Sequence, residues 1–386
     1  MSFMPIKIPL IYHGKGSLKQ LKSLRQKRIF IVTDKIIREI YGSKIERLLK
    51  KKEYVYFDEI EPDPKDTTII KGGNLAREFK PEVIIGIGGG SVMDSAKCIY
   101  FLYERDDKTL YDCDPFTYWG LGKKSKLILI PTTSGTGAEM TLAAVVTNTS
   151  EGKKVVVVSQ ELVPQMVIID PNLPLRMPPR LTASTGVDAL THAIEGIINK
   201  LNNDFTEAMN MHAIRLLLKY LPLAYKEKSD DITVRSKVHN AASLAGIGFG
   251  NSNCGIAHSC GHALGAVHHI QHGIAVGIML LYVIQFNKPT SEQKYIEILN
   301  SNNIPIKNND PTTTLVNVLK DLYKKIDIPL KLKDLNIPLN EWNEKLDTLV
   351  EFAKSDITAP FNPRDTSVDE FKKIFEYAWE GKNIDF

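Results

Sequence analysis

The stretch VIIGIGGGSVMD, residues 83–94, begins with the apolar run VIIGI, continues through Gly88, Gly89, Gly90 and Ser91, and ends in a helix-forming pattern. A buried strand that leads through glycine into a helix predicts one unit of a parallel α/β sheet. Because glycine has no Cβ, its backbone N–H groups can approach a phosphate, and the helix N-terminus beyond them adds partial positive charge. We therefore expect a pyrophosphate site here. The alternative is a tight structural turn, because Ser91 takes the place of the third glycine in the dinucleotide fingerprint.

Segments on both sides of this stretch extend the same pattern. Helical patterns and turns separate further β-like runs, which lie at residues 27–33, 54–57, 127–133, 143–149, 154–159 and 165–170. Strands this apolar predict a parallel sheet that is covered on both faces. Four prolines between Asp170 and Thr182 indicate a linker, and almost no strand-like run follows it. We predict an α/β domain over residues 1–178 and an all-helical domain over residues 179–386.

The composition limits the class of protein. With 386 residues, 43% hydrophobic and 24% charged, the chain is expected to form two folded domains. A net charge of +4 without a basic block gives no indication of nucleic acid or an acidic membrane surface as a partner. The sequence has no signal-peptide pattern and no apolar run long enough to span a bilayer, so we expect a cytoplasmic protein. Its four cysteines lack CxxC spacing and predict reduced, mostly buried thiols.

Two further features are compatible with a nucleotide cofactor. The hydroxyl- and glycine-rich loop PTTSGTGAEMT, residues 131–141, follows a buried strand and can hydrogen-bond a ribose or a phosphate, although a plain loop has the same composition. Asp34 directly follows the apolar run at residues 27–33. Its carboxylate would accept hydrogen bonds from an adenosine ribose and repel a 2′-phosphate, which favours NAD over NADP. A helix N-cap would explain the same residue equally well.

The histidines are concentrated in one mostly apolar segment. Five of the nine lie within residues 257–273, AHSCGHALGAVHHIQHG. Asp188 and His192 lie four residues apart, as do His258 and His262, so each pair shares one face of a helix. A lone buried histidine is more often a satisfied core residue, but several unpaired polar side chains in apolar helices are costly unless a cation satisfies them. We predict an N₃O site for Fe²⁺ or Zn²⁺ whose ligands are Asp188, His192, His258 and His272.

Four motifs resemble those of iron-containing (group III) alcohol dehydrogenases. They are GGGSVMDSAK at residues 88–97, IPTTSGTGAEMT at 130–141, TGVDALTHAIEG at 185–196 and HSCGHALGAVHHIQHG at 258–273. They occur in the family's order, and the resemblance covers nearly the whole chain. It implies a Rossmann-like N-terminal domain, an all-helical C-terminal domain, and a cleft between them where the nicotinamide meets the metal.

The resemblance also assigns roles to residues by position. It implies the same four metal ligands and places His262 beside the substrate as the catalytic residue. It supports NAD preference at Asp34 and implies a cofactor contact at Lys154. The residues it implies for binding the rest of the cofactor are Gly88, Gly89, Gly90, Ser91, Asp94, Thr132, Thr133 and Thr136. His269 is expected near the substrate channel and His268 in a structural role. The chain departs from the family's usual Pro-His-Gly at the last ligand, where it has Gln271-His272-Gly273.

The activity that the resemblance implies is the interconversion of short-chain primary alcohols or diols and aldehydes, with NAD and Fe²⁺ as cofactors and NADP and Zn²⁺ as their alternatives. A homodimer or larger homo-oligomer is expected, with no nucleic-acid or membrane partner. A glycerol or polyol dehydrogenase is the nearest alternative. A dehydroquinate-synthase-like lyase would need several Lys and Arg side chains facing its substrate, and the two metal-site motifs contain none. A metal-binding regulatory protein without activity is the remaining alternative.

Overall fold

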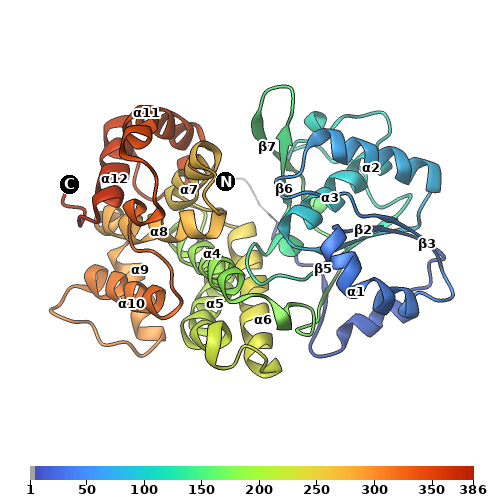
Figure 1. Ribbon diagram of the computed structural model, residues 1–386, viewed down its shortest axis with the longest axis horizontal. Coiled ribbons are helices and arrows are strands. Elements are labelled where there is room, and N and C mark those ends of the chain that lie inside the picture. The colour runs from blue at the N-terminus through green and yellow to red at the C-terminus, as the bar shows by residue number, and fades with distance from the viewer. Residues whose placement is uncertain (1–4) are drawn as a thin grey trace. The chain divides into compact units, whose positions relative to one another are not determined.

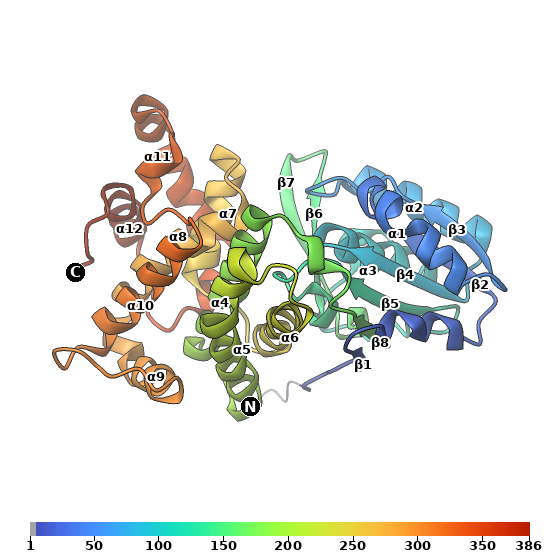
Figure 2. The same cartoon turned by 60° about the horizontal axis from the view of Figure 1, so that its bottom comes forward.

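The computed structural model describes residues 5–386. The chain divides into two compact units, one ending at Arg176 and the other beginning at Met177 (Figure 1). The strands gather in the first unit and long helices make up most of the second, as the turned view in Figure 2 also shows.

The first unit is built on a parallel sheet. Its six described strands lie in the order β1-β8-β5-β4-β2-β3, and each pairs with its neighbours in parallel. Their bounds are β1 Leu10–His13, β2 Arg28–Val32, β3 Glu53–Phe57, β4 Val83–Gly88, β5 Lys126–Pro131 and β8 Met166–Ile169. Every residue of β4 is buried, as expected for a strand in a sheet that is covered on both faces.

Helices cover both faces of this sheet. Because side chains alternate along a strand, neighbouring residues of β2 enter different hydrophobic layers. Phe30 packs in one layer with α2 (Asp66–Phe79) and α3 (Gly90–Glu104). Ile29 packs in the opposite layer with α1 (Lys35–Leu48). The α/β architecture predicted from the alternating strands and helices is therefore confirmed.

A small hairpin stands apart from the main sheet. Strands β6 (Ala143–Asn148) and β7 (Lys153–Val158) pair antiparallel in a two-stranded sheet of their own. Of the three β runs predicted after residue 141, two thus form this hairpin, and the third, β8, inserts between β1 and β5.

The second unit is helical throughout its described length and contains no strand. Its α-helices are α4 Pro179–Ile198, α5 Asp204–Pro222, α6 Ile232–Gly250, α7 Ile256–His268, α8 His272–Phe286, α9 Lys288–Ser301, α10 Pro311–Lys325, α11 Leu339–Ser355 and α12 Val368–Glu380. Helix α8 is buried without interruption from Gly273 to Ile284, which identifies it as the central helix of the core. Among the described residues, no helix is both long and apolar enough to cross a membrane.

The linker predicted between Asp170 and Thr182 is shorter in the structure. A 3₁₀ turn, Pro174–Arg176, follows β8, and α4 begins at Pro179. Proline suits the first helical position, because its φ is preset and the N–H it lacks would have no partner within the helix. The last residues of the predicted linker therefore form the first turn of α4.

The close packing of α3 on β4 can be tested with glycine substitutions. A Cβ at Gly86 would lie 2.7 Å from Ala96 Cβ and 2.8 Å from Leu129 Cδ2. We expect Gly86→Ala to lower the free energy of unfolding by about 1–3 kcal/mol, the usual cost of overpacking a core. In the control Gly42→Ala, the new Cβ makes only ordinary contacts, with Arg38 Cγ at 3.6 Å and Glu46 Oε1 at 4.0 Å, and stability should rise by about 0.5–1 kcal/mol.

Urea denaturation followed by circular dichroism measures both changes. If Gly86→Ala were as stable as the native chain, the packing of α3 on β4 would be looser than described.

Candidate functional site

The carboxyl ends of β2 and β4 lie where the strand order of the sheet reverses. The two strands are neighbours, with Val32 opposite Gly86. From β2 the chain continues to β3 on one side, and from β4 it continues to β5 on the other. Open α/β sheets bind ligands outside the carboxyl ends of the strands at such a point. Because Asp34 follows β2 and the glycine run follows β4, the topology brings both to this place.

The glycine loop packs tightly against its surroundings. A Cβ at Gly88 would lie 2.5 Å from Val92 Cβ, and one at Gly90 would lie 2.9 Å from Thr136 Cγ2. Thr132 N donates to Gly88 O at 2.9 Å, which joins the two predicted cofactor loops. The hydroxyl of Thr132 is buried without a hydrogen-bond partner. A cofactor phosphate or hydroxyl would satisfy that group, so the loops fit a nucleotide.

Of the remaining residues in these loops, Ser91 lies in the first turn of α3, and a Cβ at Gly89 would contact the Thr133 side chain at 3.5 Å. Asp34 caps helix α1, where its Oδ1 accepts from Ile37 N at 2.8 Å. The N-cap role is therefore real. It does not decide the cofactor role, because both roles use a carboxylate at the end of β2.

Two residues that the resemblance assigned to the cofactor have protein partners. Asp94 accepts from Val145 N at 3.0 Å, while its Oδ1 is buried without a partner. Burial raises the pKa of Asp94 to about 6, and the charge of Lys97 opposes that shift. Lys154 pairs with Asp63 at 2.5 Å, and its side chain is 46% exposed. The cofactor contacts of Asp94 and Lys154 remain predictions.

Three helices of the second unit bring the four predicted metal ligands together. Asp188 and His192 lie one turn apart on α4, His258 lies on α7, and His272 is the first residue of α8. Asp188 Oδ1 lies 3.2 Å from His272 Nε2, 3.6 Å from His192 Nδ1 and 3.8 Å from His258 Nε2. The ring centroids of His192 and His258 are 4.3 Å apart. The cluster belongs entirely to the second unit.

This cluster contains polar atoms that the protein leaves unsatisfied. Asp188 Oδ1, His192 Nδ1 and His258 Nε2 are all buried without a hydrogen-bond partner. Unpaired polar atoms in a protein interior are rare, because each costs desolvation free energy that nothing offsets. One cation between them would satisfy all three, and a carboxylate with imidazoles suits Fe²⁺ or Zn²⁺. The residues therefore fit the metal that the resemblance implies.

The charges of the cluster also suit a cation. Burial alone would raise the pKa of Asp188, but the nearby His192 and His272 outweigh it and leave that pKa below its ordinary value. Burial lowers the pKa of His192 well below its ordinary value. At neutral pH the carboxylate is therefore ionised and the His192 ring is neutral, and these are the forms that bind metals. Burial alone would lower the pKa of His258, but Cys254 and Glu195 outweigh it and hold that pKa well above its ordinary value, so a cation would displace a proton from this ring.

Groups behind the cluster orient its rings. Glu195 Oε2 lies 2.5 Å from His258 Nδ1, and Glu195 is fully buried. When Nδ1–H donates to this carboxylate, His258 presents the lone pair of Nε2 to the cluster. Phe249 stacks on His192 with ring centroids 3.9 Å apart. Sequence reasoning missed Glu195, although its spacing from Asp188 and His192 places all three on one face of α4.

The loop before His272 is fixed to α4 by its neighbours. Gln271 Nε2 donates to Ser184 Oγ at 2.8 Å. A Cβ at Gly273 would lie 2.1 Å from Ser184 O, so only glycine permits this approach of α8 to α4. The glutamine that replaces the family's usual proline thus supplies a side-chain link to the helix that carries Asp188.

His262 forms a pair with a residue from the distant C-terminal region. Its Nδ1 lies 2.8 Å from Asp356 Oδ2, while Thr358 N donates to Asp356 Oδ1 at 2.9 Å. Burial alone would raise the pKa of Asp356, but His262 and Thr358 lower it to about 2. The His262 side chain is 33% exposed, and its ring stacks with that of His272 at 5.3 Å between centroids. Asp356 therefore orients a partly accessible imidazole beside the cluster.

The two remaining histidines of this segment lie apart from these contacts. His268 Nδ1 lies 3.1 Å from Glu341 Oε1, and its ring stacks on Trp342 with 6.1 Å between centroids, so His268 is a packing residue. His269 ends α7 in the left-handed conformation. Its predicted place near the substrate channel remains a prediction.

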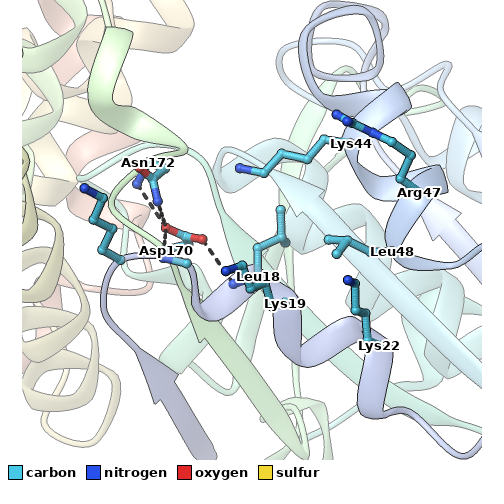
Figure 3. Close-up of a pocket in the computed structure, with 10 residues that line it drawn as sticks. Leu18, Lys19, Lys22, Lys44, Arg47, Leu48, Asp170 and Asn172 are labelled. Atoms are coloured by element: carbon cyan, nitrogen blue, oxygen red, sulfur yellow. Dashed lines mark hydrogen bonds between the residues drawn. The ribbon is translucent and has the colours of Figure 1, made fainter.

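A basic cavity is present in the first unit (Figure 3). It has a volume of about 630 Å³, and its cationic lining residues are Lys15, Lys19, Lys22, Lys44 and Arg47. Asp170 also lines it, but that carboxylate already accepts from the backbone N–H groups of Gly16 and Leu18. None of the residues predicted to bind the cofactor lines this cavity.

Comparison with known proteins gives matches over both units. The family described as iron-containing alcohol dehydrogenase matches residues 9–171, and the family described as Fe-containing alcohol dehydrogenase, C-terminal, matches residues 182–379. The NADPH-dependent butanol dehydrogenase of Clostridium saccharobutylicum is 40% identical over 97% of this chain and 98% of its own length.

Two solved structures are similar over nearly the whole chain. A 1,3-propanediol oxidoreductase aligns with a TM-score of 0.92 and 30% identity, covering 98% of this chain and all of the other. A sulfoacetaldehyde reductase from Bifidobacterium kashiwanohense in complex with NAD⁺ aligns with a TM-score of 0.87 and 27% identity, covering 98% of this chain and 99% of the other. The similarity therefore extends across both units.

The role of Glu195 behind the cluster is testable. Loss of a carboxylate that orients a ligating histidine typically weakens metal binding about 10–100-fold, and we expect that loss of Fe²⁺ and Zn²⁺ affinity in Glu195→Gln. Competition with a chromophoric chelator measures the affinities. The control is Glu207→Gln, which removes a carboxylate paired with Lys294 elsewhere in the same unit and should leave metal affinity unchanged. Equal affinity in native protein and Glu195→Gln would mean that Glu195 does not support the ligand.

Proposed function

Because the chain belongs to the iron-containing alcohol dehydrogenase family, we propose that it interconverts short-chain primary alcohols or diols and aldehydes with NAD(P). The observation that carries the proposal is the cluster of Asp188 and three histidines, in which Asp188, His192 and His258 each have a buried polar atom without a hydrogen-bond partner. A divalent cation bound there supplies Lewis-acid polarisation of the substrate oxygen, and the bound nicotinamide supplies the hydride acceptor or donor.

The protein's own residues hold and orient these groups. The ligands of the cation would be Asp188, His192, His258 and His272. The glycine loop at the end of β4 would receive the cofactor pyrophosphate, because its backbone N–H groups are accessible without a Cβ and α3 begins there. The contacts to the remainder of the nucleotide would come from Thr132, Thr133 and Thr136.

His262 would move the proton between substrate and solvent. With Nδ1 facing Asp356, the other ring nitrogen is free to accept or donate a proton. The ionised Asp356 fixes the ring orientation, and the exposure of His262 gives a route to solvent. We assign catalysis to His262 and positioning to Asp356.

The names of the relatives support the substrate class. They include a butanol dehydrogenase, a 1,3-propanediol oxidoreductase and a sulfoacetaldehyde reductase, all of which describe short alcohols, diols or aldehydes. They favour simple alcohols over the polyol and lyase alternatives. Fe²⁺ is the proposed metal on the family's description, with Zn²⁺ as the alternative.

The assembly and location are further parts of the proposal. We propose a cytoplasmic homodimer or larger homo-oligomer, in line with the family resemblance. Sedimentation velocity of the purified protein determines the oligomeric state, and a monomer at micromolar concentration would contradict the proposed homo-oligomer.

A reconstitution assay tests the function directly. Metal-stripped protein is reloaded anaerobically with Fe²⁺ or Zn²⁺, and NADH formation is followed by absorbance with a panel of short primary alcohols and diols. We expect turnover to return with the metal in the native chain. In Asp188→Asn, metal content and turnover should be lost together. If no alcohol or diol is oxidised with either metal, the proposed activity is wrong.

If His262 transfers the proton, replacing it should lower the turnover rate without weakening metal binding. His262→Ala should lower kcat by about 10²–10⁴-fold, the usual contribution of a positioned general acid or base, with metal content unchanged. Asp356→Asn should lower kcat in the same direction and also keep the metal. Steady-state kinetics with metal analysis of the same samples measures both quantities. An unchanged kcat in His262→Ala would remove this residue from the mechanism.

Asp34 predicts the choice between NAD and NADP. The relatives do not decide between the two cofactors, because one is named as NADPH-dependent and another was solved in complex with NAD⁺. The prediction therefore depends on Asp34. Asp34→Asn keeps an N-cap oxygen for Ile37 N but removes the charge that would repel a 2′-phosphate. We expect the ratio of kcat/KM for NADP to that for NAD to rise by about tenfold or more, which corresponds to about 1.4 kcal/mol. Asp34→Ser is a second variant that keeps an N-cap oxygen without the charge. If the ratio were unchanged in both variants, Asp34 would serve only as the N-cap of α1.

A further inference from the structure

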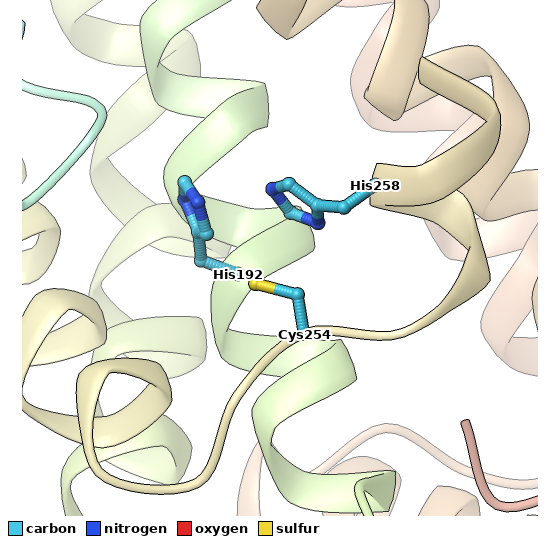
Figure 4. A group of neighbouring side chains, drawn as sticks. All are labelled: His192, Cys254 and His258. Carbon is cyan, nitrogen blue, oxygen red and sulfur yellow. The ribbon is translucent and has the colours of Figure 1, made fainter. Parts of the chain in front are cut away.

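Cys254 lies beside two of the proposed metal ligands. Its sulfur and one nitrogen each from His192 and His258 lie within 4.8 Å of one another, and all three residues are buried. Cys254 belongs to the loop between α6 and α7, four residues before His258. Figure 4 shows the sulfur directed toward the space below the two imidazole rings.

The atoms around this sulfur are suited to a second set of metal ligands. Each of the two rings has one nitrogen that is buried without a hydrogen-bond partner, His192 Nδ1 and His258 Nε2, and the His258 side chain is a hydrogen-bond partner of the Cys254 thiol. Cys254 is a free thiol. Zn–S and Zn–N bonds of about 2.3 and 2.0–2.1 Å in a tetrahedral site separate sulfur from nitrogen by about 3.6 Å. The present separations are at most 4.8 Å and so exceed that geometry by no more than about 1.2 Å, a change that side-chain rotation can supply.

We propose that Cys254, His192 and His258 form an alternative site for soft divalent cations such as Zn²⁺, which competes with the Asp188-containing set for a single ion. This inference rests on the metal site of the proposed function. Competition follows because His258 belongs to both groupings, which are His192–Cys254–His258 and Asp188–His258–His272. Thiolate favours Zn²⁺, whereas a carboxylate with imidazoles also suits the harder Fe²⁺.

The chemistry of binding requires no oxidant or reductant. The Cys254 thiol loses its proton to solvent as the metal–sulfur bond forms, and the metal keeps its oxidation state. Cys254 shares a grouping with neither Asp188 nor His272, so an ion drawn toward its sulfur would move away from those two ligands and from the partly exposed His262. Zinc should therefore bind the protein tightly while supporting less turnover than iron.

X-ray absorption at the zinc edge tests the proposal on the full-length protein loaded with Zn²⁺ alone. We expect one sulfur scatterer at about 2.3 Å in the native chain and none in Cys254→Ser. Zinc affinity, measured by chelator competition, should fall by about tenfold or more in Cys254→Ser, with Fe²⁺ affinity changed far less. Cys98→Ser is the matched control, because Cys98 is a buried free thiol in the first unit.

A second variant keeps the test informative if Cys254→Ser does not fold. His272→Gln removes a ligand that only the Asp188-containing set uses, so zinc should keep its sulfur scatterer. Absence of sulfur around zinc in both the native chain and His272→Gln would overturn the proposal. The function stands or falls separately, because alcohol oxidation by the Fe²⁺-loaded protein does not depend on Cys254.

Discussion

The buried carboxylate of Asp188 is the constraint on which the helical unit depends. It lies among three imidazole rings and is shielded from water, yet its Oδ1 has no hydrogen-bond partner from the protein. Helices α4, α7 and α8 must meet closely to create this arrangement. A Cβ at Gly273 would lie 2.1 Å from Ser184 O, which shows how near the backbones come. Without a bound ion, these unpaired polar atoms lower the free energy of unfolding, and apolar side chains at the same positions would avoid that cost.

The two units solve different physical problems. The first places the glycine loop and the hydroxyls of residues 131–141 at a strand-order reversal, where the proposed phosphate contacts would need no side-chain charge. The second brings one carboxylate and three imidazole rings together in a low-dielectric interior, where a cation would gain most. The proposed cofactor site and the proposed metal site thus lie in different units, which accounts for the different compositions of their motifs.

Local spacing made part of the site predictable. Asp188 and His192 share a helix face because they are four residues apart, and Glu195 could have been found by the same rule. Asp356 could not, because 94 residues separate it from His262 and only the packing of α11 against α7 brings them together. Asp34 shows a further limit, since a helix cap and a ribose contact require the same residue at the same place. The parallel sheet was predictable from buried apolar runs. That β6 and β7 pair with each other and not with the main sheet was not predictable, because apolar runs do not reveal which strands pair.

The most direct measurement is anomalous diffraction at the iron edge from crystals of the Fe²⁺-loaded protein. We expect one strong peak bonded to Asp188, His192, His258 and His272, with the Glu195 carboxylate in contact with His258 and outside the coordination sphere. A peak at any other set of residues, or the absence of bound iron with Asp188 still buried and unpaired, would contradict the claim that this cluster exists to hold a metal.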